Sequence, residues 1–259
     1  MRVPFPALKT MVTVFLLLMG NVSPVHPATG AIAATVASIA SSVITAGTSL
    51  AGTTLQGLAD PNFSVTCTIQ VENWTRYALM YPTVLTLGSP AVSSAPTAIL
   101  PTKKEAFATH KPRSTATGVS GTVSWELQGA ERRFVLMWAA PYNFNHYSNW
   151  MGVGMTREGL VDVAPGNTWF NQMYYHGNSE DLTFNRREFY YNLNPVIYRN
   201  DKFEIVGLMT NIHRAQIRVV IRPTINNWRD MALPIQALLV EQEEEVCNST
   251  TERMWASAL

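Results

Sequence analysis

Between residues 62 and 222 the chain repeats one pattern, in which short apolar or alternating segments are separated by clusters of turn-forming residues. Val65–Val71 and Val119–Leu127 alternate apolar and polar residues, as strands with one buried face do. Further apolar segments and the turn clusters are Arg133–Ala140, Phe203–Met209, Ala215–Ile221, Gly88–Pro90, Thr109–Thr117, Gly129–Arg132 and Thr210–Arg214. Many short strands separated by turns predict a mainly β protein, built as an antiparallel β-sandwich.

One segment inside this β region has a different pattern. Thr168–Tyr175 (TWFNQMYY) predicts a short helix on the flank of the sandwich, and Asn167 before it is a plausible N-cap. With the segments outside the β region, this predicts four parts: a signal peptide at 1–28, an N-terminal membrane-inserting helix region at 29–60, the sandwich at 61–222 and a C-terminal extension at 223–259.

The composition excludes one class of partner and allows another. The 259 residues carry a net charge of +1, which gives no electrostatic footprint for nucleic acid. Only 14% of the residues are charged, and the mean hydropathy is +0.03. This composition is typical of a soluble chain that keeps apolar surface for a later contact.

The N-terminus has the pattern of a signal peptide. Arg2 and Lys9 precede the apolar run Met11–Gly20, which is too short to span a bilayer. Several small residues between Asn21 and Gly30 leave the cleavage point open, and a short N-terminal anchor is the alternative. We therefore expect a secreted protein.

Secretion affects how the two cysteines are interpreted. Two cysteines in an oxidising compartment most simply form one disulfide, so a Cys67–Cys247 bridge is predicted; free or intermolecular thiols are the alternative. Glycosylation sequons occur at Asn62, Asn73 and Asn248.

Gly30–Leu58 is a long segment without a charged residue. Its larger apolar residues recur at spacings of four, three, four and seven and predict one helical stripe: Ile32, Val36, Ile39, Val43 and Leu50. Small and hydroxylated residues on the other faces suit close helix packing in lipid. Gly47 and Gly52 weaken the later part, which leaves a shorter helix or two pieces open. The segment is predicted to insert into membranes, and simple packing on a domain is the alternative.

A loop that mixes aromatic and amide residues follows the apolar segment ending at Ala140. Tyr142, Phe144, Tyr147 and Trp150 are interleaved with asparagine and serine. Such a mixture favours a surface that meets a partner both apolar and polar, as the headgroup region of a membrane is.

Five motifs in this order resemble the actinoporins, a family of pore-forming cytolysins. They are Ile99–Pro101 (ILP), Ala116–Gly118 (ATG), Pro141–Trp150 (PYNFNHYSNW), Trp169–Tyr175 (WFNQMYY) and Val206–Met209 (VGLM). The resemblance covers about Val65 to Ile221. With its signal peptide, longer helix region and tail, the chain is most similar to gastropod actinoporin-like toxins of the echotoxin and conoporin type.

The resemblance implies a fold and a mechanism. Members are β-sandwiches flanked by two helices that bind target-cell membranes, often through sphingomyelin. Their N-terminal amphipathic helix then detaches, inserts and lines an oligomeric, cation-permeable pore. We therefore expect membrane lipids as partners and self-association on the membrane.

The resemblance also implies site residues. The headgroup pocket would use Pro141, Tyr147, Tyr174 and Tyr175, because tyrosine faces hold a quaternary ammonium and their hydroxyls meet phosphate. The residues expected at the membrane interface are Phe144, His146, Tyr147 and Trp150, with His146 where the family usually has tryptophan.

Three pocket positions depart from the family. Ala139 replaces a serine, Phe170 replaces a tyrosine, and Ser120 stands at the pocket valine, or Val119 if the alignment shifts by one residue. The family's serine and tyrosine hydroxyls are therefore missing at Ala139 and Phe170. For this reason the predicted ligand is the headgroup of sphingomyelin or of another lipid, such as a glycolipid.

The sequence also bears on pore selectivity, on other functions and on the C-terminal extension. Gly30–Leu58 lacks the acidic residues of the family helix, so a weakly selective pore is predicted. A secreted lectin-like protein that binds lipid or glycan without forming pores is the alternative function. No enzyme motif is present, and no cofactor or metal is expected. The extension at 223–259 could be a cap, an oligomer contact, a removable piece or a solvated flank.

Overall fold

The computed structural model describes residues 36–88 and 90–242. The chain divides into two compact units, Ile44–Ala232 and a second unit of Met1–Val43 with Leu233–Leu259. The Ile44–Ala232 unit, which we call the sandwich unit, holds both β-sheets and extends past the predicted limits 61–222. The predicted signal peptide, Ile32, Cys247 and Asn248 lie outside the described residues.

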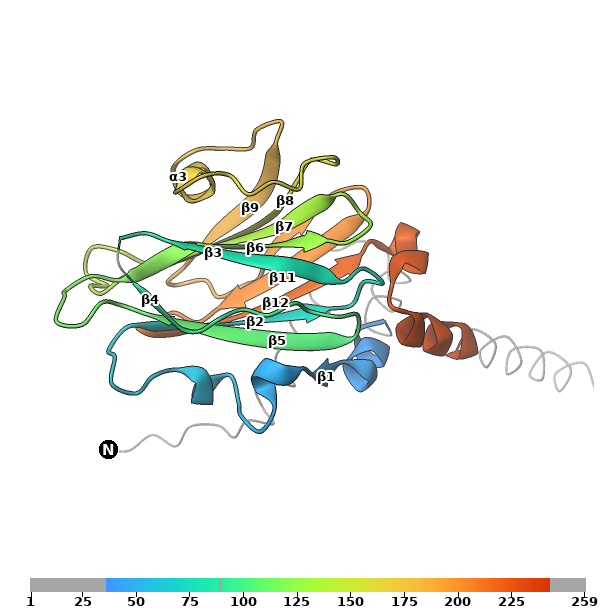
Figure 1. Cartoon of the computed structure of the whole chain (residues 1–259), viewed down its shortest axis with the longest axis horizontal. Coiled ribbons are helices and arrows are strands. Elements are labelled where there is room, and N and C mark those ends of the chain that lie inside the picture. The colour runs from blue at the N-terminus through green and yellow to red at the C-terminus, as the bar shows by residue number, and fades with distance from the viewer. Residues whose placement is uncertain (1–35, 89, 243–259) are drawn as a thin grey trace, which may run out of the picture. The chain divides into compact units, whose positions relative to one another are not determined.

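Two sheets form the layers of the sandwich (Figure 1). Over the described residues, one sheet has seven strands in the order β1-β5-β2-β12-β11-β10 with β4 beside β5, and the other has five in the order β3-β6-β7-β8-β9. The strands are β1 (Thr45–Ala46), β2 (Thr66–Asn73), β3 (Leu79–Thr86), β4 (Ala91–Ser94), β5 (Lys103–His110), β6 (Val119–Leu127), β7 (Arg132–Ala140), β8 (Asn149–Thr156), β9 (Leu182–Phe189), β10 (Val196–Arg199), β11 (Phe203–Met209) and β12 (Arg214–Pro223). The mainly β sandwich predicted from the sequence is confirmed, although β2–β12 and β1–β5 pair in parallel.

The core lies between the sheets because alternate residues of each strand are apolar. Trp125 stacks on Phe134 with ring centroids 5.7 Å apart, and Phe107 meets the edges of Trp125 and Trp138 at 6.3 and 6.0 Å. Each such buried ring contributes roughly 2–3 kcal/mol by removing apolar surface from water. The strands are therefore held by the packing of the two sheets on each other.

Helix α3 (Thr168–Tyr175) covers the outer face of the five-stranded sheet. Trp169, Phe170 and Met173 are buried there, beside Val135 and Met137 of β7. The predicted helix is confirmed, but the side chain of Asn167 makes no capping hydrogen bond although the residue is the N-cap.

The N-terminal region is helical only in part. Residues 36–43 are helical, with Val36 buried and Ile39 and Val43 partly exposed. The chain then forms β1 and two 3₁₀-helices, η1 (Thr48–Leu50) and η2 (Gln56–Leu58). The predicted stripe therefore does not continue to Leu50 on one helix.

A contact with β5 explains why the helix ends. The carboxylate of Glu105 accepts hydrogen bonds from the backbone N–H groups of Thr48 and Ser49, both at 2.8 Å. A Cβ on Gly47 would lie 1.9 Å from Glu105 Oε1, so only glycine allows this approach. Leu50 packs against Ala106 of β5, which adds apolar burial to the same contact.

Cys67 and Asn73 are both buried. Cys67 lies in the core with no exposed surface, and its predicted partner Cys247 lies outside the described residues, so the bridge stays a prediction. Burial raises the pKa of the Cys67 thiol, which keeps it protonated and unreactive. Asn73 is also fully buried, and its side-chain amide donates to the carbonyls of Tyr77 and Ile99. The asparagine of this sequon therefore stabilises a turn.

The C-terminal part of the described chain begins with a third 3₁₀-helix, η3 (Ile225–Asp230). Met231 and Ala232 are buried and end the sandwich unit, and residues 233–242 are helical. Across 36–88 and 90–242, no helix has both the length and the apolarity needed to cross a membrane.

Candidate functional site

Three loops meet at one end of the sandwich because of the strand registers. Residues 141–148 join β7 to β8, residues 190–195 follow β9, and residues 210–213 join β11 to β12. Phe189 pairs with Asn149, so the second loop starts beside the end of the first. We call the surface formed by residues 141–150, 190–195 and 210–213 the aromatic end.

Asparagine side chains fix the first loop. Asn143 Oδ1 accepts from the N–H of Asn145 at 2.9 Å, and the Asn143 carbonyl accepts from the N–H of Tyr147 at 3.2 Å. Asn149 is fully buried and donates to the carbonyls of Thr210 and Ile212 at 2.7 and 3.2 Å. The amides that are interleaved with aromatics in the sequence therefore hold this loop to the other sheet.

Phe144 lies on the side of the aromatic end that borders the β11–β12 loop. Its ring meets His213 edge-on at 4.5 Å, and His213 Nε2 lies 2.8 Å from the carbonyl oxygen of Tyr142. Phe144 is thus packed against this loop and does not join the tyrosines of α3. His146 is exposed and lies near Tyr147, with ring centroids 6.5 Å apart.

The other side of the loop borders an aromatic group that we call the tyrosine cluster: Tyr147, Trp150, Phe170, Tyr174 and Tyr175. Tyr174 is its centre. It stacks on Phe170 at 5.3 Å and meets Trp150 and Tyr175 edge-on at 5.8 and 4.8 Å. The structure thus brings together five of the residues that the sequence predicts for the headgroup pocket and interface.

The floor beside this cluster is a row of residues paired across four strands. Ser120 pairs with Ala139, Ala139 with Trp150, and Trp150 with Glu188. Directly paired residues point to the same face of a sheet, so these side chains share the face that α3 covers. Pro141 lies beyond the row, where a Cβ on Gly118 would be 2.8 Å from its Cα.

Two charged residues that sequence reasoning missed flank the tyrosine cluster. Arg186 lies with its guanidinium carbon 6.0 Å from the Trp150 ring centroid and donates to the carbonyl of Met173 at 2.8 Å. Glu188 is exposed next to Trp150 in the register. Nothing in the segment Asn185–Phe189 (NRREF) distinguishes these residues from an ordinary solvated strand.

The environment of Tyr174 keeps its hydroxyl protonated. Partial burial, together with the neighbouring Tyr175, Tyr147 and Glu188, raises the pKa of Tyr174, and Arg186 opposes the change. At neutral pH the Tyr174 hydroxyl is therefore a hydrogen-bond donor, the form that an anionic oxygen requires.

Large apolar side chains are exposed across the aromatic end. Tyr147 is 63% exposed, and Tyr191, which the sequence prediction missed, is 93% exposed. Leu193 and Ile212 add further exposed apolar surface in the other two loops. Phe189–Asn194 (FYYNLN) repeats the mixture of aromatic and amide residues seen at 141–150, and that composition could have identified it.

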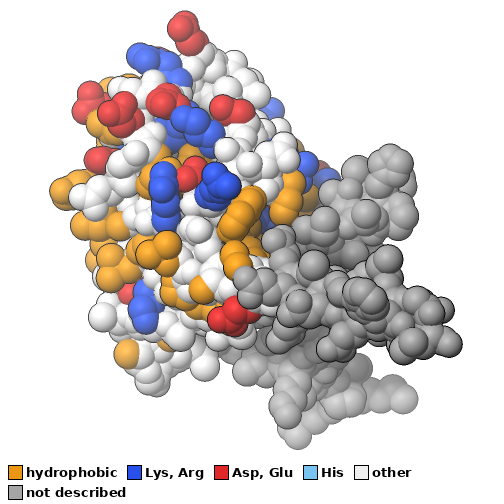
Figure 2. Space-filling view, turned by 90° about the vertical axis from the view of Figure 1, so that its right-hand side faces the viewer, with side chains coloured by type: hydrophobic (Ala, Val, Ile, Leu, Met, Phe, Trp, Pro, Cys, Tyr) orange, Lys and Arg blue, Asp and Glu red, His pale blue; other side chains and the backbone are white. Residues whose placement is uncertain are grey.

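Charge is mixed on one face of the molecule. On the face shown in Figure 2, basic, acidic and hydrophobic side chains are interspersed, which agrees with the small net charge. Within the described residues, no group of three or more histidine, cysteine or acidic side chains could hold a metal ion.

Comparisons with known proteins identify relatives along most of the chain. No family model matches it. Conoporin-Cn1 of Conus consors is 54% identical over 239 residues, which cover 92% of this chain and 95% of that protein. Tereporin-Ca1 of Terebra anilis is 63% identical over 191 residues, covering 73% of this chain and 100% of the relative. Echotoxin-2 of Monoplex parthenopeus is 41% identical over 189 residues, which cover 73% of this chain and 68% of that protein.

Among solved structures, the lipid-binding protein Nakanori matches 62% of this chain and 72% of its own, with a TM-score of 0.48 and 13% identity. The named relatives are toxins and not enzymes, and they confirm the resemblance found in the sequence motifs. With such identities over nearly the full length of two relatives, the chain belongs to the actinoporin-like pore-forming toxins of gastropods.

Proposed function

We propose that this chain is a secreted cytolysin that docks on target-cell membranes through the aromatic end. After docking, it self-associates and inserts its N-terminal helix region to form an ion-permeable pore. The family membership supports the pore, and the geometry of the aromatic end supports the docking surface.

The observation that carries the proposal is the exposure of large aromatic side chains on a rigidly held end. Tyr147 and Tyr191 stand 63% and 93% exposed, whereas Asn149 below them is fully buried and bonded to the other sheet. Aromatic rings with a polar tip are favoured where hydrocarbon meets headgroups. A rigid platform of such residues positions the sandwich at a membrane without unfolding.

The tyrosine cluster is the proposed headgroup site. Tyr147 and Tyr175 offer exposed ring faces to a quaternary ammonium, and the protonated Tyr174 hydroxyl offers a donor to the phosphate. Ala139 and Phe170 supply no hydroxyl, so Ser120 and Arg186 are the remaining donors beside the cluster. This donor set suits a phosphocholine headgroup such as that of sphingomyelin, with a glycolipid headgroup as the competing ligand.

The proposed inserting element is the helix region that ends at Val43. Its apolar stripe consists of Ile32, Val36, Ile39 and Val43, and residues 36–43 are already helical before insertion. A helix satisfies its own backbone hydrogen bonds and is therefore a backbone form that can enter lipid. Directly after this helix β1 (Thr45–Ala46) pairs with β5, and the Glu105 contact at Thr48 and Ser49 holds the next residues to the same strand.

The pore is proposed to be weakly selective. Gly30–Leu58 contains no acidic residue, and rings of carboxylates are one route to cation selectivity. Reversal potentials measured in planar bilayers under a potassium chloride gradient are expected to lie near zero. A reversal potential close to the potassium equilibrium value would contradict this prediction.

Vesicles of defined composition test the proposed function. Binding by co-sedimentation and release of a trapped dye are measured on phosphatidylcholine vesicles with sphingomyelin, with a neutral glycolipid, or with neither. The proposal predicts binding together with release, and the lipid that strengthens both identifies the headgroup. Binding without release on every composition would instead support a lectin-like protein.

A further inference from the structure

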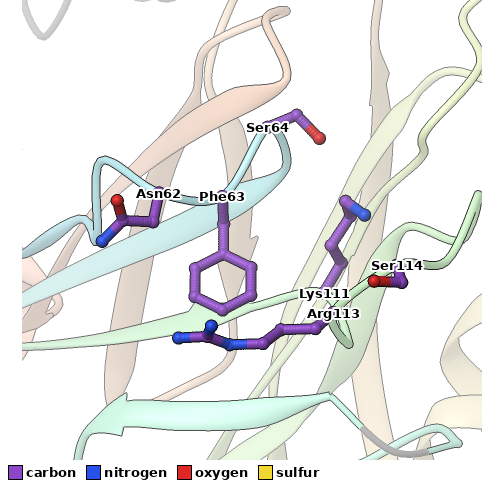
Figure 3. A pocket seen from close by; sticks show the side chains of 6 residues that line it. All are labelled: Asn62, Phe63, Ser64, Lys111, Arg113 and Ser114. Carbon is purple, nitrogen blue, oxygen red and sulfur yellow. The ribbon is translucent and has the colours of Figure 1, made fainter.

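A second pocket shares no residue with the tyrosine cluster, and Figure 3 shows the side chains that line it. Its volume is about 320 Å³, and its lining residues are Asn62, Phe63, Ser64, Lys111, Arg113 and Ser114. They come from the segment before β2 and from the loop between β5 and β6. The lining contains two basic residues and no acidic one.

In the part of the chain that the structure describes, no carboxylate pairs with the two positive charges of the pocket, Lys111 and Arg113. Lys111 is only 8% exposed, and its ammonium donates to the neutral carbonyls of Thr115 and Pro112 at 2.5 and 3.5 Å. A largely buried ammonium without a counter-charge is costly, and an anion in the pocket would lower that cost.

Phe63 holds the second cation in a defined orientation. Its buried ring stacks on His110 at 3.6 Å on one side, and the guanidinium carbon of Arg113 lies 5.5 Å from the ring centroid (Figure 3). A guanidinium that stacks on a ring through its face keeps its N–H edge free. That edge is the part that binds two oxygens of a phosphate or carboxylate.

The surroundings of the pocket favour a small oxyanion. The nearby acidic residue Asp60 accepts from the backbone N–H and the side-chain amide of Asn62, both at 2.9 Å, and so belongs to its own turn. The hydroxyls of Ser64 and Ser114 add neutral donors to the lining. Two cations with hydroxyls and an amide in a small cavity match the oxygens of a phosphate group.

The position of the pocket indicates where the phosphate comes from. The Lys111 ammonium lies 5.6 Å from the ring centroid of Tyr142, which is 43% exposed and belongs to the loop of the aromatic end. The pocket and the tyrosine cluster thus lie on opposite sides of the same loop. A sandwich that docks with this loop would bring the pocket to the level of the headgroups.

We propose that the pocket formed by Phe63, Lys111 and Arg113 binds the phosphate of an anionic phospholipid, as a second lipid contact separate from the tyrosine cluster. This inference rests on the proposed function, because the lipid must reach the pocket through docking at the aromatic end. It assigns the chain a preference for membranes with exposed phosphate charge, which the net charge of +1 does not suggest.

The test compares three variants with the wild type on vesicles of phosphatidylcholine and sphingomyelin, with and without phosphatidic acid. Arg113→Gln removes the exposed cation of the pocket, and Phe63→Leu removes the ring that orients it. Arg76→Gln is the charge-matched control, since Arg76 follows β2 at its other end and pairs with Asp230. Protein without a glycan at Asn62 is used, because that sequon residue lines the pocket.

Phosphatidic acid is expected to tighten wild-type and Arg76→Gln binding roughly tenfold, about the effect of one charge-assisted bidentate contact, and to have little effect on Arg113→Gln and Phe63→Leu. An equal gain in Arg113→Gln and Arg76→Gln would overturn the proposal. Inorganic phosphate, measured by calorimetry, is expected to bind the wild type only weakly. Tight binding of inorganic phosphate with no response to phosphatidic acid would overturn the lipid assignment. Failure of the wild type to bind any of these vesicles would instead refute the proposed function.

Discussion

Tyr147 is the single side chain on which the docking account depends most. Its side chain is 63% exposed, and its backbone N–H donates to the carbonyl of Asn143. It also lies near Tyr174 of α3 and helps to raise the pKa of that residue. An exposed ring in such a position contributes nothing to the fold that the structure shows. Its role is therefore best explained by a partner outside the chain.

The substitution Tyr147→Ala is expected to weaken binding to sphingomyelin vesicles about tenfold, because it removes an aromatic contact at the interface. Tyr81→Ala is the matched control, since Tyr81 is 61% exposed on β3, away from the aromatic end. Co-sedimentation measures both variants. Equal affinities for the two would show that Tyr147 does not face the membrane.

Glu204 of β11 illustrates a residue whose role is stability. It is 5% exposed, and both its oxygens accept from guanidinium groups, those of Arg199 and Arg222. Burial raises its pKa, but the charges and hydrogen bonds of the two arginines outweigh burial, so the pKa of Glu204 lies below its usual value. Its contribution to stability is thus present above the ordinary glutamate pKa and is lost as the pH falls through the lowered one.

Glu204→Gln is expected to lower the free energy of unfolding by about 3 kcal/mol at neutral pH, because it leaves the largely buried Arg222 without its counter-charge. The difference from the wild type should shrink as the pH falls below the lowered pKa. Urea unfolding at neutral and acidic pH measures both effects. Asp181→Asn, at the exposed ion pair with Arg157, is the control, and a similar loss there would argue against a special role for burial.

Sequence reasoning succeeded with single residues where local composition carried the signal. The tyrosines and Trp150 gather as expected, because they sit on a loop and a helix whose motifs are contiguous in the chain. Cys67 shows the limit: two cysteines and a secretory pattern predict a bridge, but the cysteine count does not show that Cys67 lies in the core. Arg186 and Glu188 were missed because only the β8–β9 register brings them to Trp150.

Among the elements, the segment after the N-terminal helix must either detach from the sandwich unit or stay bound to it when the helix inserts. Thr48 and Ser49 are bonded to Glu105 through two backbone N–H groups and through both hydroxyls. The Ser49 hydroxyl oxygen also accepts a hydrogen bond from the N–H of Ala106 in β5, at 2.7 Å. Together with the pairing of β1 and β5, this contact holds the segment from Thr45 to Ser49 to the sheet.

Replacing Glu105 by glutamine is expected to loosen this segment. The amides of Thr48 and Ser49 should exchange with deuterium at least roughly tenfold faster, because hydrogen bonds to a charged acceptor are worth more than those to a neutral one. Amides within β8 serve as the internal reference, and dye release should become faster at unchanged lipid affinity. Unaltered exchange at both amides would show that the carboxylate does not hold the segment.

The elements also show which local patterns decide structure. Strands β6 and β7 were predictable because burial sets their patterns: the sequence of β6 alternates, and that of β7, which is buried on both faces, is almost continuously apolar. The end of the N-terminal helix was not predictable from its stripe, because the decisive partner, Glu105, lies 57 residues from Thr48. Gly47 and Gly52 gave the local hint, and glycine alone does not distinguish a tolerated position from a break.

In the molecule as a whole, the sandwich unit presents two candidate lipid contacts on either side of one loop. The tyrosine cluster has aromatic faces and a protonated donor, and the pocket of Phe63, Lys111 and Arg113 has uncompensated positive charge. Neither contact needs the helix region that ends at Val43. Docking and insertion are therefore assigned to separate parts of the chain.

This separation is the central claim, and one paired measurement on a variant lacking residues 30–43 tests it most directly. The variant keeps the whole sandwich unit from Ile44, including the Glu105 contact. Binding and dye release are recorded on the same sphingomyelin vesicles for the variant and the full chain. The account predicts unchanged binding and abolished release, and undiminished release by the variant would contradict it.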